Sequence, residues 1–457
     1  MDGQPGVPGV THPPEDPYLP GRPEGGLSVD RYELELDYRV ATNRLDARAV
    51  VHAQASRTLD RFSLDLRGLR VRQVLVGGKR PERWALHDGR LTVRLGREVL
   101  AGTSLLVEVR YGGQPGPARG PWGEVGWEEL EDGLIVAGQP DGAPTWFPCH
   151  DSPADKATFG VTVTAEAGYE VITNGRLISR TPRAGRVRWV YDQPEPMAPY
   201  LATLQIGRYE RLATGSGTEA LVPPRLETAA LYDLGRQPEM IALFEERFGP
   251  YPFAAGYTVV VTDDVLEIPL EAQGLSVFGA NHMDGRRGSE RLVAHELAHQ
   301  WFGNSLTVGR WRDIWLHEGF ACYAEWLWSE RSGGWTAHRM ARSVRARLSL
   351  LPQDLLIGDP GAAAMFDDRL YKRGALTLHA LRLTVGDDVF FEILRTWTAR
   401  YRHGTVSTEQ FVACASEVAG TSLVLLVESW LYRPALPELP PLPPSGGGSS
   451  GLVPRLG

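Results

Sequence analysis

Two histidines and two glutamates stand at spacings that suit hydrolysis at a metal ion. The segment His295-Glu296-Leu297-Ala298-His299 is followed, after eighteen further residues, by Glu318. Positions i and i+4 share one face of a helix, so His295 and His299 can direct ring nitrogens at one zinc ion. Glu318 then supplies the third ligand from a second element and leaves a fourth position open for water. An open position is typical of catalytic zinc, and Glu296 is expected to act there as the general base.

Two helices are expected to position these ligands. The first extends over residues 290–302, with Ser289 as its capping hydroxyl and apolar residues along one flank. The second extends over residues 311–330, carries Glu318 near its beginning and is closed by two glycines. The same pentapeptide arises by chance in roughly a few per cent of chains of this length. The apolar flank and the second helix argue against such an accidental surface helix.

The zinc-binding segments resemble the aminopeptidase N family of zinc peptidases, peptidase family M1, which includes the bifunctional leukotriene hydrolase. The resemblance lies first in His295–Asn304 and Trp315–Ala321. Further similar stretches follow in the family's order: Phe147–Pro153, Tyr200–Ala202, Phe248–Phe253 and Tyr371–Gly374. Together they cover the chain from about residue 30 to about residue 440. The resemblance implies a gluzincin fold and one zinc ion per chain.

Tyr371 is the residue that the resemblance assigns to the oxyanion. Tyr371-Lys372-Arg373-Gly374 resembles the family's Tyr-x-Lys-Gly element, whose phenol donates a hydrogen bond to the oxygen on which negative charge develops. Arg373 stands at the place of the family's lysine and keeps the positive charge. The residues alone favour a different interpretation, in which Tyr371 is a packed aromatic at a helix start.

Glu271 and Gln139 are the residues that the resemblance assigns to the free amine of a substrate. The family binds this ammonium with the glutamate of a Gly-x-Met-Glu-Asn stretch, and Ile268–Ala272 stands at that place with only the glutamate retained. Gln139, eight residues before Phe147, stands where the family carries a second amine-facing side chain. The alternative for both is a solvated loop residue.

Three residues near Glu318 need separate interpretations. His317 is adjacent to a ligand but diverges from it by about 100° on a helix, so it is expected to point elsewhere. Glu325 lies seven residues after Glu318 on the same face and is the better candidate for orienting a ligand histidine, with Asp313 and Asn304 weaker ones. Cys322 is expected to be a buried small residue rather than a ligand, because the zinc ligand set is already complete.

Composition excludes several classes of partner. The 457 residues carry a net charge of −8 without a basic stripe, so neither nucleic acid nor a membrane surface is an expected partner. The three cysteines are widely spaced and predict no disulfide framework. No signal peptide and no run long enough to span a bilayer is visible, which favours a cytoplasmic location. We expect a monomer.

Hydrophobic periodicity divides the chain into a multidomain α+β protein. Residues 1–27 form an arm rich in proline and glycine, and alternating strand patterns with turn signals predict an antiparallel β domain over 28–209. Helical patterns over 210–444, with a short strand-rich piece before the zinc helix, indicate a mainly helical domain that the resemblance identifies as thermolysin-like. Residues 445–457 are interpreted as a linker and cleavage tag. Many family members continue into a further helical domain, so we expect a short form with a more open site.

The leading functional hypothesis is a zinc aminopeptidase that hydrolyses the N-terminal bond of peptides with a free N-terminus. A second hypothesis keeps the zinc ion and changes the substrate, giving an endopeptidase or an epoxide hydrolase. A third is an inactive binding protein on the same fold. The retention of both Glu296 and Tyr371 argues against the third hypothesis, because a site freed from catalysis has no need of a base and an oxyanion donor.

Overall fold

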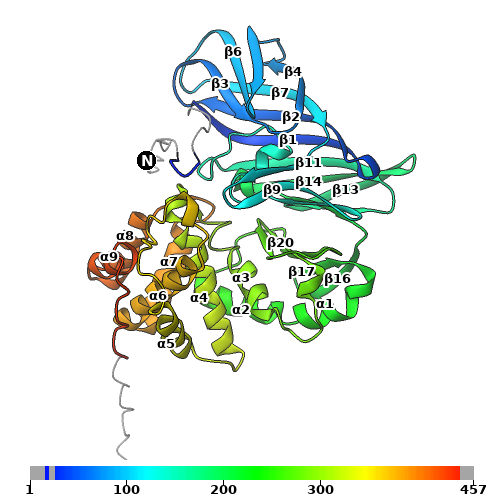
Figure 1. Ribbon diagram of the computed structural model, residues 1–457. Coiled ribbons are helices and arrows are strands. Elements are labelled where there is room, and N and C mark those ends of the chain that lie inside the picture. The colour runs from blue at the N-terminus through cyan, green and yellow to red at the C-terminus, as the bar shows by residue number, and fades with distance from the viewer. Residues whose placement is uncertain (1–15, 20–25, 443–457) are drawn as a thin grey trace, which may run out of the picture.

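The computed structural model describes residues 16–19 and 26–442. Most of the arm expected over 1–27, and all of the expected tag over 445–457, therefore lie outside the described residues. The chain forms a β-rich half followed by a helix-rich half, and Figure 1 shows the first stacked on the second. Within the described part of the chain, no helix is both long enough and apolar enough to cross a bilayer.

A seven-stranded sheet forms the body of the β-rich half. Its strand order is β13-β14-β11-β1-β2-β7-β4. In chain order these strands are β1 (Leu27–Arg39), β2 (Arg44–Ala55), β4 (Arg70–Val76), β7 (Ser104–Gly113), β11 (Ala157–Glu166), β13 (Arg176–Arg183) and β14 (Arg186–Met197).

Strand β1 shows why the sequence folds in this way. Tyr32, Leu34, Leu36 and Tyr38 are buried, while the acidic residues between them are exposed. Alternate side chains of a strand point to opposite faces, so this pattern gives one apolar face and one wet face. The expected antiparallel domain is wrong in one respect, because β1 pairs with β11 in parallel. Two parallel strands need a long crossover between them. Strands β1 and β11 are far apart in the sequence, so no local turn signal could predict their pairing.

Two smaller sheets complete this half. A five-stranded sheet has the order β12-β15-β10-β9-β8, and a three-stranded sheet has the order β3-β6-β5. Their strands are β3 (Leu59–Asp65), β5 (Arg83–His87), β6 (Arg90–Val99), β8 (Pro117–Gly120), β9 (Gly123–Leu130), β10 (Gly133–Ala137), β12 (Glu170–Thr173) and β15 (Leu204–Gly207).

The helix-rich half begins with a five-stranded sheet of order β16-β17-β18-β20-β19, and β21 pairs with β22. These strands are β16 (Glu210–Gly215), β17 (Thr218–Val222), β18 (Tyr257–Val261), β19 (Leu270–Ala272), β20 (Leu275–Phe278), β21 (Thr307–Val308) and β22 (Thr405–Val406). The helices are α1 (Glu227–Leu234), α2 (Gln237–Phe248), α3 (Glu290–Ala298), α4 (Trp315–Arg331), α5 (Ala337–Leu348), α6 (Asp368–Val385), α7 (Asp387–Arg400), α8 (Thr408–Ala419) and α9 (Val424–Leu431). The predicted domain boundary between residues 209 and 210 stays a prediction.

The ends of two helices depend on whether a side chain caps them. Ser289 precedes α3, but its side chain makes no capping hydrogen bond, so the expected cap is wrong. The regular part of α3 ends at Ala298, four residues before the expected end. Helix α6 begins at Asp368, where the side chain of Asp367 accepts a hydrogen bond from the Arg369 amide. Tyr371 therefore lies inside the first turn of a helix.

Hydrogen bonds hold the two halves together around the zinc-binding helices. Asn174 of the β-rich half donates to the Gln273 carbonyl at 2.9 Å, beside the turn between β19 and β20. The Trp122 indole nitrogen, at the turn between β8 and β9, donates to the Ala362 carbonyl at 2.8 Å, shortly before α6. Residues between strands of the β-rich half thus contact the turn between β19 and β20 and the segment before α6.

Candidate active site

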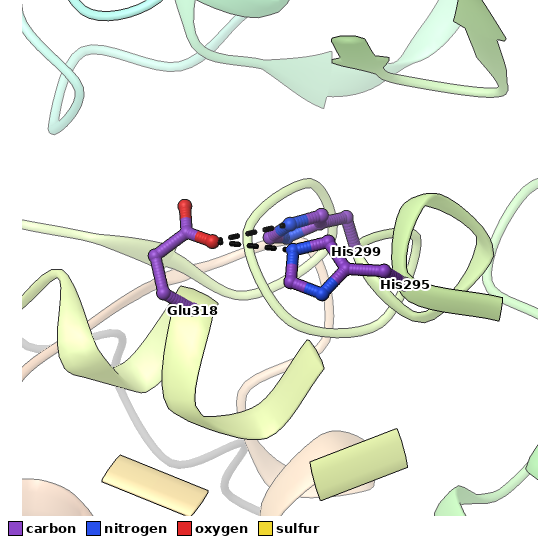
Figure 2. A group of neighbouring side chains, drawn as sticks. All are labelled: His295, His299 and Glu318. Carbon is purple, nitrogen blue, oxygen red and sulfur yellow. Dashed lines mark ion pairs between the residues drawn. The ribbon is translucent and has the colours of Figure 1, made fainter. Parts of the chain in front are cut away.

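His295, His299 and Glu318 converge as the spacing predicted. His295 lies in α3, His299 is the residue that ends it, and Glu318 lies in the first turn of α4. The Glu318 carboxylate oxygen Oε2 is 3.4 Å from His295 Nε2 and 3.5 Å from His299 Nε2. Figure 2 shows the carboxylate facing both rings. All three residues are buried, at 8% exposure or less.

The three side chains fit a zinc ion. Ligand atoms around a tetrahedral ion with bonds of about 2.0–2.1 Å stand roughly 3.3 Å apart, which matches the two measured separations. The neutral imidazole offers zinc one nitrogen, and here both Nδ1 atoms are already engaged, which leaves Nε2 of each ring for the metal. Although burial acts against it, the two imidazoles hold the pKa of Glu318 well below its usual range, so this ligand is ionised.

Each ligand histidine is oriented by an acceptor on its other nitrogen. His295 Nδ1 is 2.8 Å from Glu325 Oε1, and Arg291 donates to the same oxygen at 2.8 Å. His299 Nδ1 is 3.0 Å from the Phe302 carbonyl. Such acceptors fix the tautomer and the ring plane of a zinc ligand. The position expected for Glu325 is confirmed by this contact, whereas the Phe302 carbonyl was not foreseen.

Glu296 projects into the same buried space. Its side chain is 4% exposed, and Oε2 has no hydrogen-bond partner among the described residues. One of its oxygens, one oxygen of Glu271 and one nitrogen of His299 lie within 4.8 Å of one another. Burial and nearby carboxylates raise the pKa of Glu296, while the two imidazoles oppose them. A carboxylate with a raised pKa and a free oxygen is suited to accept a proton at near-neutral pH.

Tyr371 stacks beside the ligand His295. The two rings are 6.2 Å apart between centroids and inclined by 17°. Burial raises the pKa of the phenol well above its usual value, and the carboxylates of Glu318 and Glu271 add to this effect, so the hydroxyl keeps its proton. A protonated phenol next to the metal ligands can donate a hydrogen bond into the site.

A pair of glycines sets how closely α4, which carries Glu318, approaches α6, which carries Tyr371. A Cβ atom on Gly319 would lie only 2.9 Å from the Cα atom of Gly374, and one on Gly374 would lie 2.7 Å from the Cα of Gly319. Side-chain carbons cannot approach main-chain atoms so closely. The two helices therefore cross through direct contact of their backbones.

Glu271 lies on the edge strand β19, at the border of the site. Gln300 and Asn304, which follow the zinc helix, donate to the carbonyl of the neighbouring Ala272 at 3.1 Å and 2.9 Å. The side chain of Asn304 thus anchors this strand rather than a ligand histidine. Burial raises the pKa of Glu271 to about 7, His299 lowers it and nearby carboxylates raise it further. No arginine or lysine among the described residues pairs with Glu271.

Gln139 follows β10 and has an unsatisfied amide. Its Nε2 is buried without a hydrogen-bond partner among the described residues. The adjacent Gly138 packs against the main chain of Tyr200, since a Cβ atom there would lie 2.2 Å from the Tyr200 carbonyl oxygen. Burial raises the pKa of Tyr200, and the charges of Glu271 and Glu318 contribute. Tyr200 therefore lies near the site, although the sequence analysis assigned no role to it.

Three residues close in sequence to Glu318 or Tyr371 make their contacts outside the group of zinc ligands. His317 Nε2 accepts the Val308 amide at 2.9 Å, and burial lowers the pKa of its ring to about 3. Cys322 is fully buried and receives a contact from Lys372 at 3.5 Å. Arg373, at the place of the family's lysine, donates instead to the Trp430 carbonyl in the last turn of α9 at 2.7 Å and to the Pro434 carbonyl after this helix at 2.8 Å.

Comparison with known proteins gives two family matches and several relatives. The model of the peptidase M1 N-terminal domain matches residues 28–201, and that of the peptidase family M1 domain matches residues 232–430. A crystal structure of an M1 zinc metallopeptidase from Deinococcus radiodurans shares 31% sequence identity, covers 93% of this chain and 98% of its own, and has a TM-score of 0.84.

Two further relatives bear on substrates and on length. A mutant M1 zinc metallopeptidase from Deinococcus radiodurans bound to a Tyr-Ser-Ala substrate shares 30% identity, covers 93% of this chain and 99% of its own, and has a TM-score of 0.83. The leucyl aminopeptidase of Saccharolobus solfataricus is 25% identical over 438 residues, which are 90% of this chain and 54% of that protein. The chain spans about half the length of the curated relatives it matches.

Proposed function

Since this chain belongs to peptidase family M1, we propose that it is a zinc aminopeptidase that hydrolyses the first bond of peptides with a free N-terminus. His295, His299 and Glu318 hold the zinc ion. When bound, zinc supplies Lewis acidity, which polarises the scissile carbonyl and makes water acidic enough to attack it at neutral pH.

Glu296 is the general base in this proposal. Its unpartnered oxygen accepts a proton from the attacking water, and its raised pKa then allows the same carboxyl to pass that proton to the leaving amine. Tyr371 donates its hydroxyl hydrogen to the oxygen that becomes negative as the carbonyl is attacked, because its phenol stays protonated beside the ligands.

The observation that carries the aminopeptidase assignment is the unpaired Glu271 carboxylate beside the metal ligands. An ammonium group would supply the cation that the described residues do not provide for Glu271. The buried Gln139 amide, which has no partner among the described residues, is the second group that we assign to the ammonium. An endopeptidase substrate offers no ammonium at this place. The Tyr-Ser-Ala substrate bound by the Deinococcus relative supports peptides as the substrate class.

The test compares one peptide with a free N-terminus and the same peptide after N-acetylation. We expect cleavage only of the first bond of the free peptide, with the acetylated form at least about tenfold slower, since about 1.4 kcal/mol corresponds to a factor of ten and a charge-assisted contact exceeds it. Mass spectrometry of the products identifies the bond. Equal rates for both peptides, or cleavage at internal bonds, would assign the protein to the endopeptidase alternative.

A further inference from the structure

Lys156 extends from the β-rich half into the loop that follows the zinc helix. It immediately precedes β11, and its Nζ donates to the carbonyls of Asn304 at 3.0 Å, Ser305 at 2.8 Å and Gly404 at 3.4 Å. Among the described residues no carboxylate pairs with it. An ammonium has three N–H donors, so the three carbonyls match its capacity. The lysine therefore cross-links main-chain segments of the other half of the molecule.

The loop that Lys156 binds is hydrogen-bonded directly to a zinc ligand. The Asn304 amide donates to the His299 carbonyl at 3.0 Å, and the Phe302 carbonyl is the acceptor for His299 Nδ1 at 3.0 Å. The Thr307 hydroxyl donates to the Gly303 carbonyl at 2.7 Å. Residues 302–307 thus form one hydrogen-bonded unit that begins at the ligand and ends at β21. Displacing the carbonyls of residues 304 and 305 would displace the acceptor that orients the His299 ring.

The segment that carries Lys156 is itself fixed within the β-rich half. Asp155 accepts hydrogen bonds from the Val29 amide at 3.2 Å and pairs with His150 Nδ1 at 2.7 Å. Burial lowers the pKa of Lys156 to about 7, while its three carbonyl acceptors favour the charged form. A lysine held in this way from a separate sheet can keep a loop in one position.

We propose that Lys156 is a positioning residue that fixes the zinc ligand His299 by holding the carbonyls of residues 304, 305 and 404. The inference rests on the proposed zinc site but not on the choice of substrate. Residues that orient a zinc ligand through a second group usually change zinc affinity about 10-fold to 100-fold when they are removed. The β-rich half would then contribute to metal binding without offering a ligand.

The test is the dissociation constant of zinc for Lys156→Met, measured by chelator competition. Arg373→Met is the matched control, because Arg373 is also a buried cation on main-chain carbonyls, yet its carbonyls belong to the end of α9 and the segment after it, away from the loop that follows the zinc helix. Both variants should lower the melting temperature. We expect a zinc dissociation constant at least about tenfold higher for Lys156→Met only, and a changed visible spectrum of its cobalt-substituted form only.

Lys156→Gln serves as the second variant, since its amide can keep two of the carbonyl contacts without a charge. If Lys156→Met does not fold, Lys156→Ala takes its place, because it also removes every side-chain contact with the three carbonyls, and an unchanged zinc dissociation constant in Lys156→Ala overturns the proposal. Lys156→Gln should lie closer to wild type than either. A zinc dissociation constant of Lys156→Met within about twofold of wild type, with a fall in melting temperature equal to the control, also overturns it. These measurements use zinc or cobalt alone, so they are independent of whether the wild-type protein is an aminopeptidase.

Discussion

The metal-binding part of the site and its rim differ in how their polar groups are satisfied. Both ligand histidines have an acceptor on the nitrogen that faces away from the metal. At the rim, Gln139 Nε2 has no partner among the described residues, and Glu271 pairs with no arginine or lysine. The difference separates a part that the protein orders by itself from a part whose contacts, in our proposal, the substrate completes. Changes in the first should lower metal binding or the chemical step, and changes in the second should lower recognition.

The largest effect is expected for Glu296→Gln. Removing a general base typically lowers kcat by about 10²-fold to 10⁴-fold, because the attacking water then loses its proton without assistance. Zinc content, measured by atomic emission, should stay at one ion per chain. Retention of more than about a tenth of the wild-type kcat would remove Glu296 from the role of base.

Tyr371→Phe should come next, with kcat lowered by about 10²-fold to 10³-fold, the usual effect of losing one donor to a developing oxyanion. Because this hydrogen bond forms only as charge develops, KM should change little. Steady-state kinetics on a chromogenic aminoacyl substrate separates the two constants. A packed aromatic without a catalytic role would instead show a fall in melting temperature and near-normal kcat.

Glu325→Gln tests the metal-binding part without replacing any of the three zinc ligands. We expect the zinc dissociation constant to rise about 10-fold to 100-fold, because a neutral amide orients the His295 ring less firmly than a carboxylate. The readout is chelator competition followed by activity after zinc is added in excess. Full zinc affinity in this variant would mean that the short contact between Glu325 and His295 does not tune the metal.

Glu271→Gln tests the rim. Loss of a charge-assisted contact should lower kcat/KM for free-amine peptides, by an amount equivalent to about 1.5–3 kcal/mol of transition-state stabilisation. Zinc affinity should stay unchanged. The already slow cleavage of the N-acetylated peptide should not fall further. Gln139→Ala is the weaker companion, at about 0.5–1.5 kcal/mol, because its contact with the ammonium is that of a neutral amide. A fall in zinc content of either variant would place the residue with the metal-binding part instead.

The last prediction concerns stability rather than catalytic rate, at the start of the segment that carries Lys156. Burial lowers the pKa of His150, but Asp155 and further carboxylates outweigh it and raise the pKa above its usual value. A raised folded-state pKa gives stability that is fully present below about pH 6.5 and is lost as pH rises through the higher value. His150→Gln should therefore destabilise by about 2 kcal/mol at pH 6 and by less at pH 9, as urea unfolding would show. A constant difference across this range would contradict the ion pair.

The sequence predicted the metal-binding part better than its supports. His295 and His299 lie at helical spacing along α3, and Glu318 and Glu325 lie at helical spacing along α4, so local geometry aligns each pair. The packing of α3 against α4 brings the two pairs together. Lys156 and the Phe302 carbonyl were not foreseen, because the lysine acts across 148 or more positions and a main-chain carbonyl has no sequence signature. The Ser289 cap was wrong for a related reason, since residue type permits a capping bond without requiring it. Glu271 and Gln139 were found only through resemblance.

The glycine contact between α4 and α6 limits how this enzyme scaffold can be altered. Gly319 adjoins the ligand Glu318, and Gly374 lies three residues after Tyr371. The contact between the two helix backbones therefore sets the distance from the metal ligand to the phenol. Core side chains can exchange volume with their neighbours, but peptide groups in contact cannot. A protein engineer who repacks this half would leave that span unchanged, whereas a methyl group at either glycine would lengthen it. New substrate preferences are therefore more accessible through the residues around Glu271 and Gln139 than through the helices beneath them.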